Sequence, residues 1–146
     1  MQHVSELGAL INRYQDASST VMRRVHNEIR SSLRDDLTVE QYGILRYVRE
    51  REYATSTELA DIFLVGKSAI TSIITKLVDK ALLSRQPDPV DRRIIRLAIT
   101  EEGKALSQNT DRWVEEWLAK YLVHFTQGEV EMFITSFEKL AKLVSK

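Results

Sequence analysis

Cysteine is absent from this chain of 146 residues, and proline and glycine are scarce. Without a thiol, the protein can form no disulfide, no cysteine-ligated zinc or iron–sulfur site, and no thiol-based redox sensor or nucleophile. With two prolines and five glycines, extended Pro/Gly-rich disorder is excluded as well. A chain of this length buries about 68–70% of its unfolded surface, so it needs no cross-link to hold a core. The lack of cysteine fits a reducing compartment, and we expect a cytoplasmic protein.

Long hydrophobic runs are also missing. No stretch approaches the roughly 18 apolar residues of a membrane span, and the start MQHVSELGAL does not have the pattern of a signal peptide. The histidines His3, His26 and His124 are scattered without metal-ligand spacing, so we expect no metal site. We also expect no cofactor, and the lack of long apolar runs predicts no membrane partner. The sequence has no Gly-rich phosphate loop, nucleophile elbow or His-Glu metal helix, which argues against an enzyme.

The net charge is zero, with 21 basic and 21 acidic residues, but the charges are unevenly distributed. Residues 65–100 contain seven Lys or Arg and three Asp, a local charge of +4, whereas the segments on either side each carry −2. Local potential, rather than total charge, steers binding to phosphate. A nucleic-acid partner is therefore one interpretation of this basic segment, and chance variation on a solvated surface is the other.

Apolar periodicity predicts a mainly helical chain. From Val4 to Ile29 the apolar residues follow the three-four spacing of a coiled-coil seam, which predicts an amphipathic helix about 40 Å long. A small domain cannot bury a stripe of this length, so a partner helix is implied. Further helices are predicted from Thr38 to near Glu50, from Thr55 to Phe63, from Lys67 to about Lys80 with Ala81 on its apolar side, from Thr100, and from Thr126.

Three of the predicted helix starts carry a capping box, in which threonine precedes Gln or Glu by three positions. These boxes are Thr38–Gln41, Thr55–Glu58 and Thr126–Glu129. The helix that starts at Thr100 also carries Trp113 and Trp117 one turn apart. We interpret both tryptophans, like Tyr42 and Tyr47, as core residues rather than as a ligand cage.

The period changes after residue 81. Leu82–Gln86 is short and extended, Pro87–Asp91 holds both prolines, and alternation over Arg93–Ile99 predicts a return strand. A two-stranded hairpin directly after two short helices is typical of a winged helix-turn-helix. Small polar residues on the second of these helices would fit a DNA major groove, and arginines at the hairpin tip would reach the minor groove.

Two segments resemble the MarR-type (multiple antibiotic resistance regulator) family. Residues 59–77, LADIFLVGKSAITSIITKL, resemble its helix-turn-helix, and residues 91–103, DRRIIRLAITEEG, resemble its wing signature of Asp-x-Arg, two spaced aliphatics and Thr-x-x-Gly. The resemblance implies a mainly α fold with a small β-wing. It also implies an N-terminal dimerisation helix (1–36), a winged helix-turn-helix DNA-binding domain (37–100) and C-terminal dimerisation helices (101–146).

The function implied by the resemblance is that of a cytoplasmic transcriptional regulator. A homodimer would bind a pseudo-palindromic operator in double-stranded DNA, as a repressor, and a small aromatic effector would control it through a pocket that the sequence does not identify. Arg93 would enter the minor groove and Asp91 would orient it, while Arg92 would contact phosphate. The expected DNA-binding residues are Lys67, Ser68, Thr71, Ser72, Thr75, Lys76, Arg92 and Arg93.

Other interpretations of the same residues stay open. The polar face of the helix from Lys67 could be an ordinary solvated surface, and the arginines could form surface ion pairs with Asp88 or Asp91. The competing function is a winged-helix protein-interaction adapter without DNA contacts. Such an adapter would carry an acidic or apolar recognition surface.

Four positions depart from the pattern of the resembling family. Leu64 stands where a turn glycine is common, and Ala81 replaces a frequent glycine ahead of the first wing strand. Gly66 takes the usual Ser position at the helix N-cap, which is a tolerable replacement. Ser72 stands where many relatives carry Arg, which removes an expected guanine-reading side chain.

Overall fold

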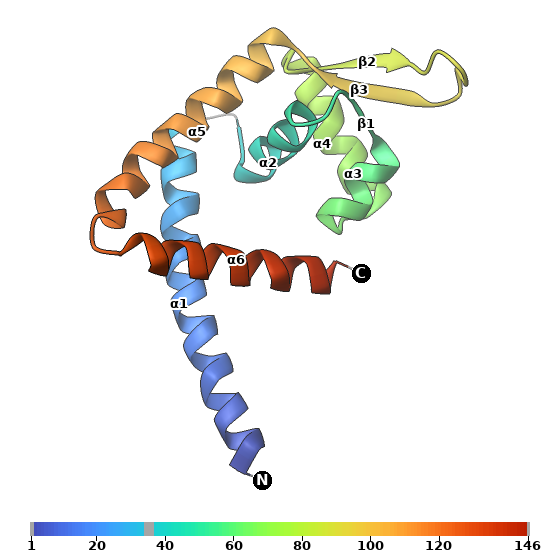
Figure 1. The fold of residues 1–146 in the computed structure, drawn as a ribbon. Coiled ribbons are helices and arrows are strands. Elements are labelled where there is room, and N and C mark those ends of the chain that lie inside the picture. Colours follow the sequence, from blue (N-terminus) through green and yellow to red (C-terminus); the bar gives the residue numbers. More distant parts are fainter. Residues whose placement is uncertain (1, 34–36, 146) are drawn as a thin grey trace.

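The computed structural model of the protein describes residues 2–33 and 37–145, and within these ranges the chain forms six helices and three strands (Figure 1). The predicted fold class, mainly α with a small β-wing, is confirmed. The predicted domain boundary after residue 36 borders a segment that lies outside the described residues. The elements are α1 (Gln2–Ser32), α2 (Val39–Arg49), β1 (Ala54–Thr55), α3 (Ser56–Phe63), α4 (Lys67–Asp79), β2 (Leu83–Pro87), β3 (Ile95–Ile99), α5 (Glu101–Leu122) and α6 (Gln127–Val144).

Two of the three predicted capping boxes are fully formed, at the starts of α2 and α6. Thr38 and Thr126 each accept a hydrogen bond from the backbone N–H three residues on, and the side chain at that position accepts one from the backbone N–H of the threonine. At Thr55 the predicted box is only half formed. The Thr55 hydroxyl accepts from the Glu58 N–H at 3.2 Å, but the Glu58 carboxylate accepts from the Tyr47 hydroxyl at 2.7 Å instead of reaching back.

The predicted hairpin is confirmed, since β2 pairs antiparallel with β3, but it belongs to a three-stranded sheet in the order β1-β3-β2 that was not predicted. The third strand, β1, pairs Ala54 with Leu97 along the inner edge of β3. It has only two residues, so no alternation of apolar and polar positions could reveal it in the sequence. Its effect is to attach the base of the wing to the segment between α2 and α3.

The hydrophobic core lies between α2, α3, α4 and the buried side of the sheet. The last turn of α1 also enters this core through Ile29, and Leu33 joins it directly after the helix, so α1 is anchored at its C-terminal end. Of the tyrosines predicted to lie in the core, Tyr42 is buried and Tyr47 packs against the core. The most deeply buried large side chains are Ile44, Leu45, Leu59, Ile70, Ile74, Leu77, Leu82, Leu83 and Leu97.

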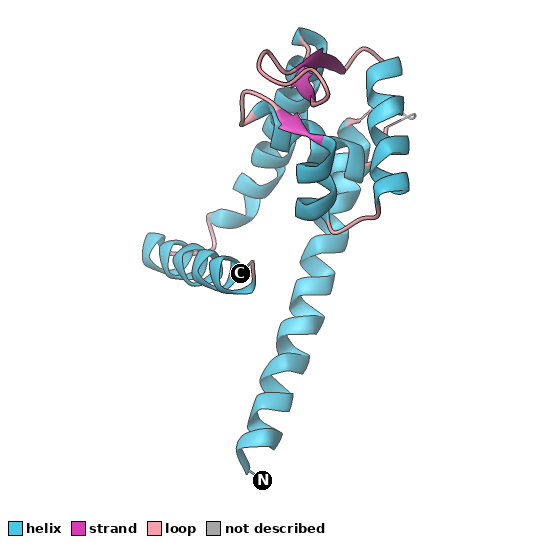
Figure 2. Ribbon diagram, turned by 90° about the vertical axis from the view of Figure 1, so that its right-hand side faces the viewer, coloured by secondary structure: helices cyan, strands magenta, loops and turns pink. Residues whose placement is uncertain are grey.

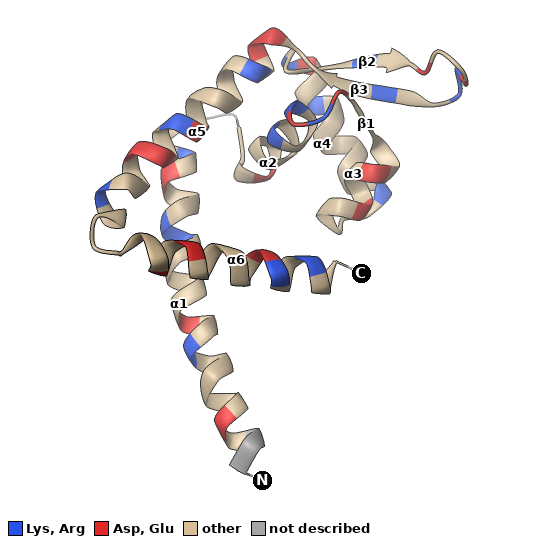
Figure 3. Cartoon of the chain, viewed as in Figure 1, with Lys and Arg blue, Asp and Glu red and all other residues tan. Residues whose placement is uncertain are grey.

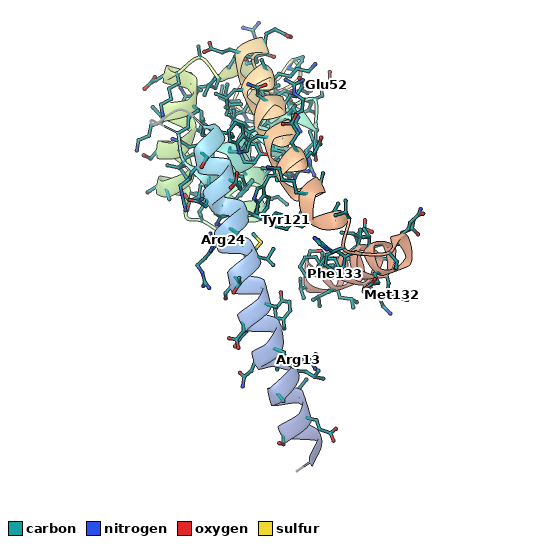
Figure 4. The ribbon with its side chains drawn as sticks, turned by 90° about the vertical axis from the view of Figure 1, so that its left-hand side faces the viewer. Arg13, Arg24, Glu52, Tyr121, Met132 and Phe133 are labelled. Carbon is teal, nitrogen blue, oxygen red and sulfur yellow. The ribbon has the colours of Figure 1, made fainter. Side chains whose placement is uncertain are left out.

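The apolar faces away from this core are uncovered. Figure 2 shows α6 standing apart from α1, although the two cross in the view of Figure 1. In Figure 4, Met132 and Phe133 lie on this separate helix, below Tyr121 of α5. The interpretation of Trp113 as a core residue was wrong, since 47% of its surface is exposed; Trp117 is half-buried. Along the described residues, no helix has the length and apolar character needed to cross a membrane.

Two residues that are not glycine have left-handed backbone conformations. Leu64, which ends α3, has a φ of 53°, and Ala81, which follows α4, has a φ of 60°. Both are positions where the family resemblance predicts glycine, which adopts positive φ without a steric cost. The expectation that Ala81 continues the apolar face of α4 was wrong: the chain turns at this residue and its side chain is exposed.

Candidate nucleic-acid interface

The helix α4 has one buried face and one exposed face. Ile70, Ile74 and Leu77 anchor it in the core. Gly66 is its N-cap, with extended backbone and no side-chain cap, so the first-turn N–H groups are not covered by a capping side chain. The predicted contact residues Lys67, Ser68, Thr71, Ser72 and Lys76 are all exposed.

Thr75 differs from the other predicted residues of this face. It is half-buried, and its hydroxyl accepts a hydrogen bond from Nη2 of Arg85 at 3.1 Å. Arg85 lies on β2, so this contact places a further exposed cation beside the polar face of α4. Arg85 is one of the seven Lys or Arg residues of the basic segment 65–100, but it was not among the predicted contact residues. The periodicity of a strand does not show that the strand runs back along the preceding helix.

The two arginines predicted at the wing tip differ in their contacts. Arg93 donates from Nε and Nη2 to the two carboxylate oxygens of Asp91, each at 3.0 Å. The Asp91 carboxylate also accepts from the backbone N–H of Arg93 at 3.1 Å. Arg92 is exposed, and among the residues that the structure describes none forms a hydrogen bond or ion pair with it. The orienting contact expected between Asp91 and Arg93 is therefore present, and it is also the surface ion pair that formed the alternative interpretation.

A second carboxylate, that of Asp88, organises the base of the tip. Its Oδ1 accepts from the backbone N–H groups of Val90 at 2.8 Å and Asp91 at 2.9 Å, and its Oδ2 accepts from Nε of Arg96 at 2.9 Å. The Arg96 guanidinium lies over the ring of Tyr53, 3.8 Å from the centroid. The tip is therefore connected, through Asp88 and Arg96, to the chain just ahead of β1.

The pKa values of both wing carboxyls are lowered by these contacts. For Asp88, the main cause is the pair of backbone hydrogen bonds from Asp91 and Val90, and the hydrogen bond from Arg96 adds to it. For Asp91, the main cause is the hydrogen bond from the Arg93 side chain. Both carboxylates are thus ionised at neutral pH and hold the loop in one conformation.

The exposed face of α4 and the wing carry basic side chains, which the acidic recognition surface of an interaction adapter would not. Figure 3 shows Lys and Arg on β2, on β3 and at the loop that joins them. The acidic side chains of this loop, Asp88 and Asp91, are engaged by Arg96 and Arg93. The wing tip therefore presents the cations Arg92 and Arg93, next to the exposed apolar side chain of Val90. Across the described residues, no group of three or more His, Asp or Glu side chains is placed to hold a metal ion.

Comparisons with known proteins agree with this geometry. The profile of the MarR family matches residues 35–94. YpoP of Bacillus subtilis, an uncharacterized HTH-type transcriptional regulator, is 34% identical over 84% of this chain and 86% of its own length. The multiple antibiotic resistance protein MarR of Escherichia coli is 31% identical over 73% of this chain and 74% of its own length.

The fold is also similar to the crystal structure of a mutant Escherichia coli MarR complexed with operator DNA. The TM-score is 0.71 at 24% identity, and the match covers 89% of this chain and 94% of that one. At this identity the similarity concerns the fold, whereas the two sequence relatives carry the assignment to a family. The chain belongs to the MarR family of winged helix-turn-helix transcriptional regulators.

Proposed function

We propose that this protein is a repressor that binds double-stranded operator DNA in the cytoplasm, as a homodimer. The observation that carries the proposal is the juxtaposition of an exposed polar face on α4 with a wing tip where Asp91 holds Arg93. A helix of this kind fits the major groove with its first turns against base edges, and a narrow minor groove attracts arginine. A mutant of the Escherichia coli relative MarR has been crystallised in complex with operator DNA.

Each predicted contact residue has a role in this proposal. Thr71 and Ser72 would read base edges, whereas Lys67 and Ser68 at the N-terminus of α4 would contact phosphate or bases nearby. Lys76, Arg85 and Arg92 would contact phosphates on either side. Arg93 would enter the minor groove, and Thr75 would hold Arg85, from whose Nη2 its hydroxyl accepts a hydrogen bond.

A second copy of the chain is proposed to cover the exposed apolar faces of α1, α5 and α6. Six large apolar side chains of α1 between Leu7 and Met22 are exposed, and no side chain of α6 is buried. Such faces are larger than the isolated patches usual on a monomer, and an obligate interface of more than about 2,000 Å² would cover them. The dimer would present its two α4 helices to successive major grooves, about 34 Å apart. Exposed side chains of α5, α6 and the loop between them that would enter this interface include Leu118, Tyr121, Phe125, Phe133, Ile134, Phe137 and Leu140.

The test combines selection of DNA by the protein with measurement of its mass. The full chain is incubated with a random-sequence duplex pool, bound duplexes are sequenced, and sedimentation gives the mass of the free protein. We expect a two-fold symmetric consensus and a dimer at micromolar concentration. A monomer that behaves well at this concentration would overturn the dimer.

Salt dependence separates DNA binding from the adapter function. A dimer that neutralises up to about eight phosphates should give a slope of log affinity against log salt near −7, at about −0.9 per phosphate. The same selected duplex is titrated by fluorescence anisotropy at several salt concentrations. A slope near zero would favour the adapter.

Control by a small aromatic acid is the finer part of the proposal. A cleft of about 460 Å³ lies between the end of α1 and α5, with Ser32, Leu106 and Arg112 among its lining residues. It is next to the connection between the winged domain and the long helices, where a bound ligand can favour one spacing of the α4 helices over another. Tenfold release of DNA requires about 1.4 kcal/mol of such differential binding. The test adds salicylate, peroxide or a chelator to the protein–DNA complex. We expect release by salicylate alone, and release by peroxide or chelator would contradict the proposal.

A further inference from the structure

The helix α5 connects the winged domain to the proposed dimer face, because its two halves face different surroundings. Its N-terminal half packs against the winged domain, where Gly103, Ser107 and Thr110 are buried. Its C-terminal half carries the exposed apolar side chains Trp113, Leu118 and Tyr121. The orientation of the winged domain relative to the dimer face is therefore set where α5 meets α2.

This α2–α5 joint is closed by a polar network around Asp111. The Asp111 Oδ1 accepts a hydrogen bond from the Tyr42 hydroxyl, and its Oδ2 accepts one from Nη2 of Arg49 at 2.5 Å. The Nη1 of Arg49 donates to the Ser107 hydroxyl at 2.9 Å, one turn earlier on α5. That hydroxyl in turn donates to the backbone carbonyl of Lys104 at 3.1 Å, which fixes its direction.

The network is shielded from water. The side chain of Arg49 is 13% exposed and that of Asp111 is 22% exposed. Burial, followed by the hydrogen bond to Asp111, raises the pKa of Tyr42, so its hydroxyl stays protonated and continues to donate. The carboxylate therefore has donors on both oxygens, and the guanidinium has acceptors on two turns of the same helix.

A neighbouring hydrogen bond fixes α5 on its other side. The hydroxyls of Ser32, at the end of α1, and Thr110 are joined by a hydrogen bond of 3.0 Å. Thr110 and Asp111 are consecutive, so this one turn of α5 is held by α1 and by α2. The two contacts limit both sliding and rotation of α5 against the winged domain.

Directional hydrogen bonds of this kind differ from apolar packing in one important respect. The hydrophobic effect has no directional requirement, whereas a carboxylate bound at both oxygens has one register that satisfies every donor. A shift of one helix by part of a turn would leave a largely buried charge without its partners. The joint therefore favours a single angle between α2 and α5.

We propose that Asp111 is a positioning residue for operator binding, which fixes the separation of the two α4 helices although it belongs to neither α4 nor the wing. This inference rests on the proposed function as a DNA-binding dimer. In such a dimer, the second winged domain binds its half-site intramolecularly once the first is bound. The affinity gained in this step depends on how well the separation of the two α4 helices matches the spacing of the half-sites. A loosened joint lowers that gain and widens the range of spacings that the dimer accepts.

The experiment compares paired and single half-sites. From the duplex selected by the wild-type protein, a set with one or two base pairs added or removed between the half-sites is made, together with a short duplex containing one half-site. We expect Asp111→Asn to reduce the preference for the paired site over the single site by about tenfold and to flatten the dependence on spacing. Affinity for the single half-site should stay within about twofold of wild type, since one winged domain suffices there.

Two further variants make the result decisive. Tyr42→Phe removes one donor to Asp111 and keeps the buried ring, so it should produce a smaller change in the same direction if Asp111→Asn is poorly folded. Glu115→Gln makes the same change of charge at an exposed position of α5 and should leave the spacing profile unchanged.

The outcomes distinguish this inference from the function on which it rests. An equal loss of affinity on single and paired half-sites would place the effect of Asp111 inside the winged domain and overturn its positioning role. An unchanged spacing profile in both Asp111→Asn and Tyr42→Phe would overturn it as well. A wild-type protein without preference for paired sites would overturn the dimeric function itself, and this inference with it.

Discussion

Arg93 and Asp91 form a two-point ion pair at the tip of the wing, with Nε–Oδ1 and Nη2–Oδ2 distances of 3.0 Å. The arginine side chain is 91% exposed, so the pair adds little to the free energy of folding. It does favour one direction of a long side chain over the others. Because ordering such a side chain on binding costs about 0.5–1.5 kcal/mol, a pair that orders it beforehand favours entry into a groove.

The first prediction separates the wing from α4. Arg93→Ala should weaken binding to all operator variants by similar factors, with an additional weakening where the minor groove is narrow and rich in A·T pairs. Thr71→Ala or Ser72→Ala should instead change the preference among bases by about 1–3 kcal/mol for each good hydrogen bond to a base edge that the substitution removes. Competition binding with single-base operator variants measures both effects. A changed base preference in Arg93→Ala, with none in Ser72→Ala, would reverse the assigned roles.

The second prediction concerns the pH dependence of the wing tip. The pKa values of Asp88 and Asp91 are lowered in the folded chain, so the ionised carboxylates keep their hydrogen bonds above the ordinary value of about 3.9 and release them as the pH falls through the lower folded values. We expect no change at the tip between pH 8 and pH 5. Carboxyl NMR titration should give midpoints below about 3.9 for both residues.

The control for this titration is Arg93→Gln. It removes the main cause of the shift at Asp91 and leaves the backbone hydrogen bonds to Asp88 in place. The midpoint of Asp91 should rise while that of Asp88 stays where it is. A midpoint of Asp91 that does not respond would show that the ion pair is absent in solution.

Local signals in the sequence were sufficient for most helix boundaries and for the polar face of α4. A capping box at Thr38 or Thr126 depends only on residues three apart, and the stripe of α4 depends on a regular period. The strand β1, the hydrogen bond from Arg85 to Thr75 and the joint at Asp111 all need residues that are distant in the chain. Their partners are chosen by tertiary packing, which a single sequence does not display.

Trp113 illustrates the same limit from the opposite direction. Its spacing from Trp117 correctly indicated a shared apolar helix face, but spacing does not tell whether the same chain covers that face. In the structure, Trp113 is exposed and its Nε1 donates to the carboxylate of Glu28 at 3.0 Å. The periodicity of α1 allowed the stronger inference of a partner helix, because an apolar stripe of that length exceeds what one small domain can bury.

The third prediction is that glycine stabilises the protein at both left-handed positions. Leu64 is 90% exposed and Ala81 is also exposed, so replacement by glycine sacrifices little burial. A left-handed conformation costs a residue with Cβ about 1–2 kcal/mol, and the greater freedom of glycine in the unfolded chain offsets about 0.4–1 kcal/mol of the relief. Leu64→Gly and Ala81→Gly should each raise the free energy of unfolding by about 0.5–1 kcal/mol.

Urea unfolding at a fixed protein concentration measures these changes. Ala69→Gly is the matched control, because Ala69 is exposed inside α4, where glycine should lower the free energy of unfolding by about 1 kcal/mol. If Ala81→Gly destabilised the protein as much as Ala69→Gly does, the left-handed turn after α4 would be contradicted.

The fourth prediction concerns Gly103, the last residue of the wing signature. A Cβ at this position would lie 2.2 Å from the carbonyl oxygen of Leu82 and 3.0 Å from Cγ1 of Ile99. The Leu82 carbonyl already accepts a hydrogen bond from the Thr100 N–H at 3.2 Å, so the backbone at the base of the wing has to move. Gly103→Ala should therefore lower the free energy of unfolding by about 1–3 kcal/mol, which is typical of overpacking.

The companion variant for Gly103→Ala is Gly43→Ala. A Cβ at Gly43 inside α2 would meet only the Phe63 ring, at 3.4 Å, which is ordinary contact. Alanine there should raise the free energy of unfolding by about 0.5–1 kcal/mol, since glycine is a poor helix former.

Gly103→Ala should in addition weaken operator binding more than its lower stability explains, because β2 and the first turn of α5 would shift apart. Both proteins are compared by urea unfolding and by anisotropy on the same duplex, and a Gly103→Ala protein as stable as Gly43→Ala would contradict the close packing of α5 on the wing.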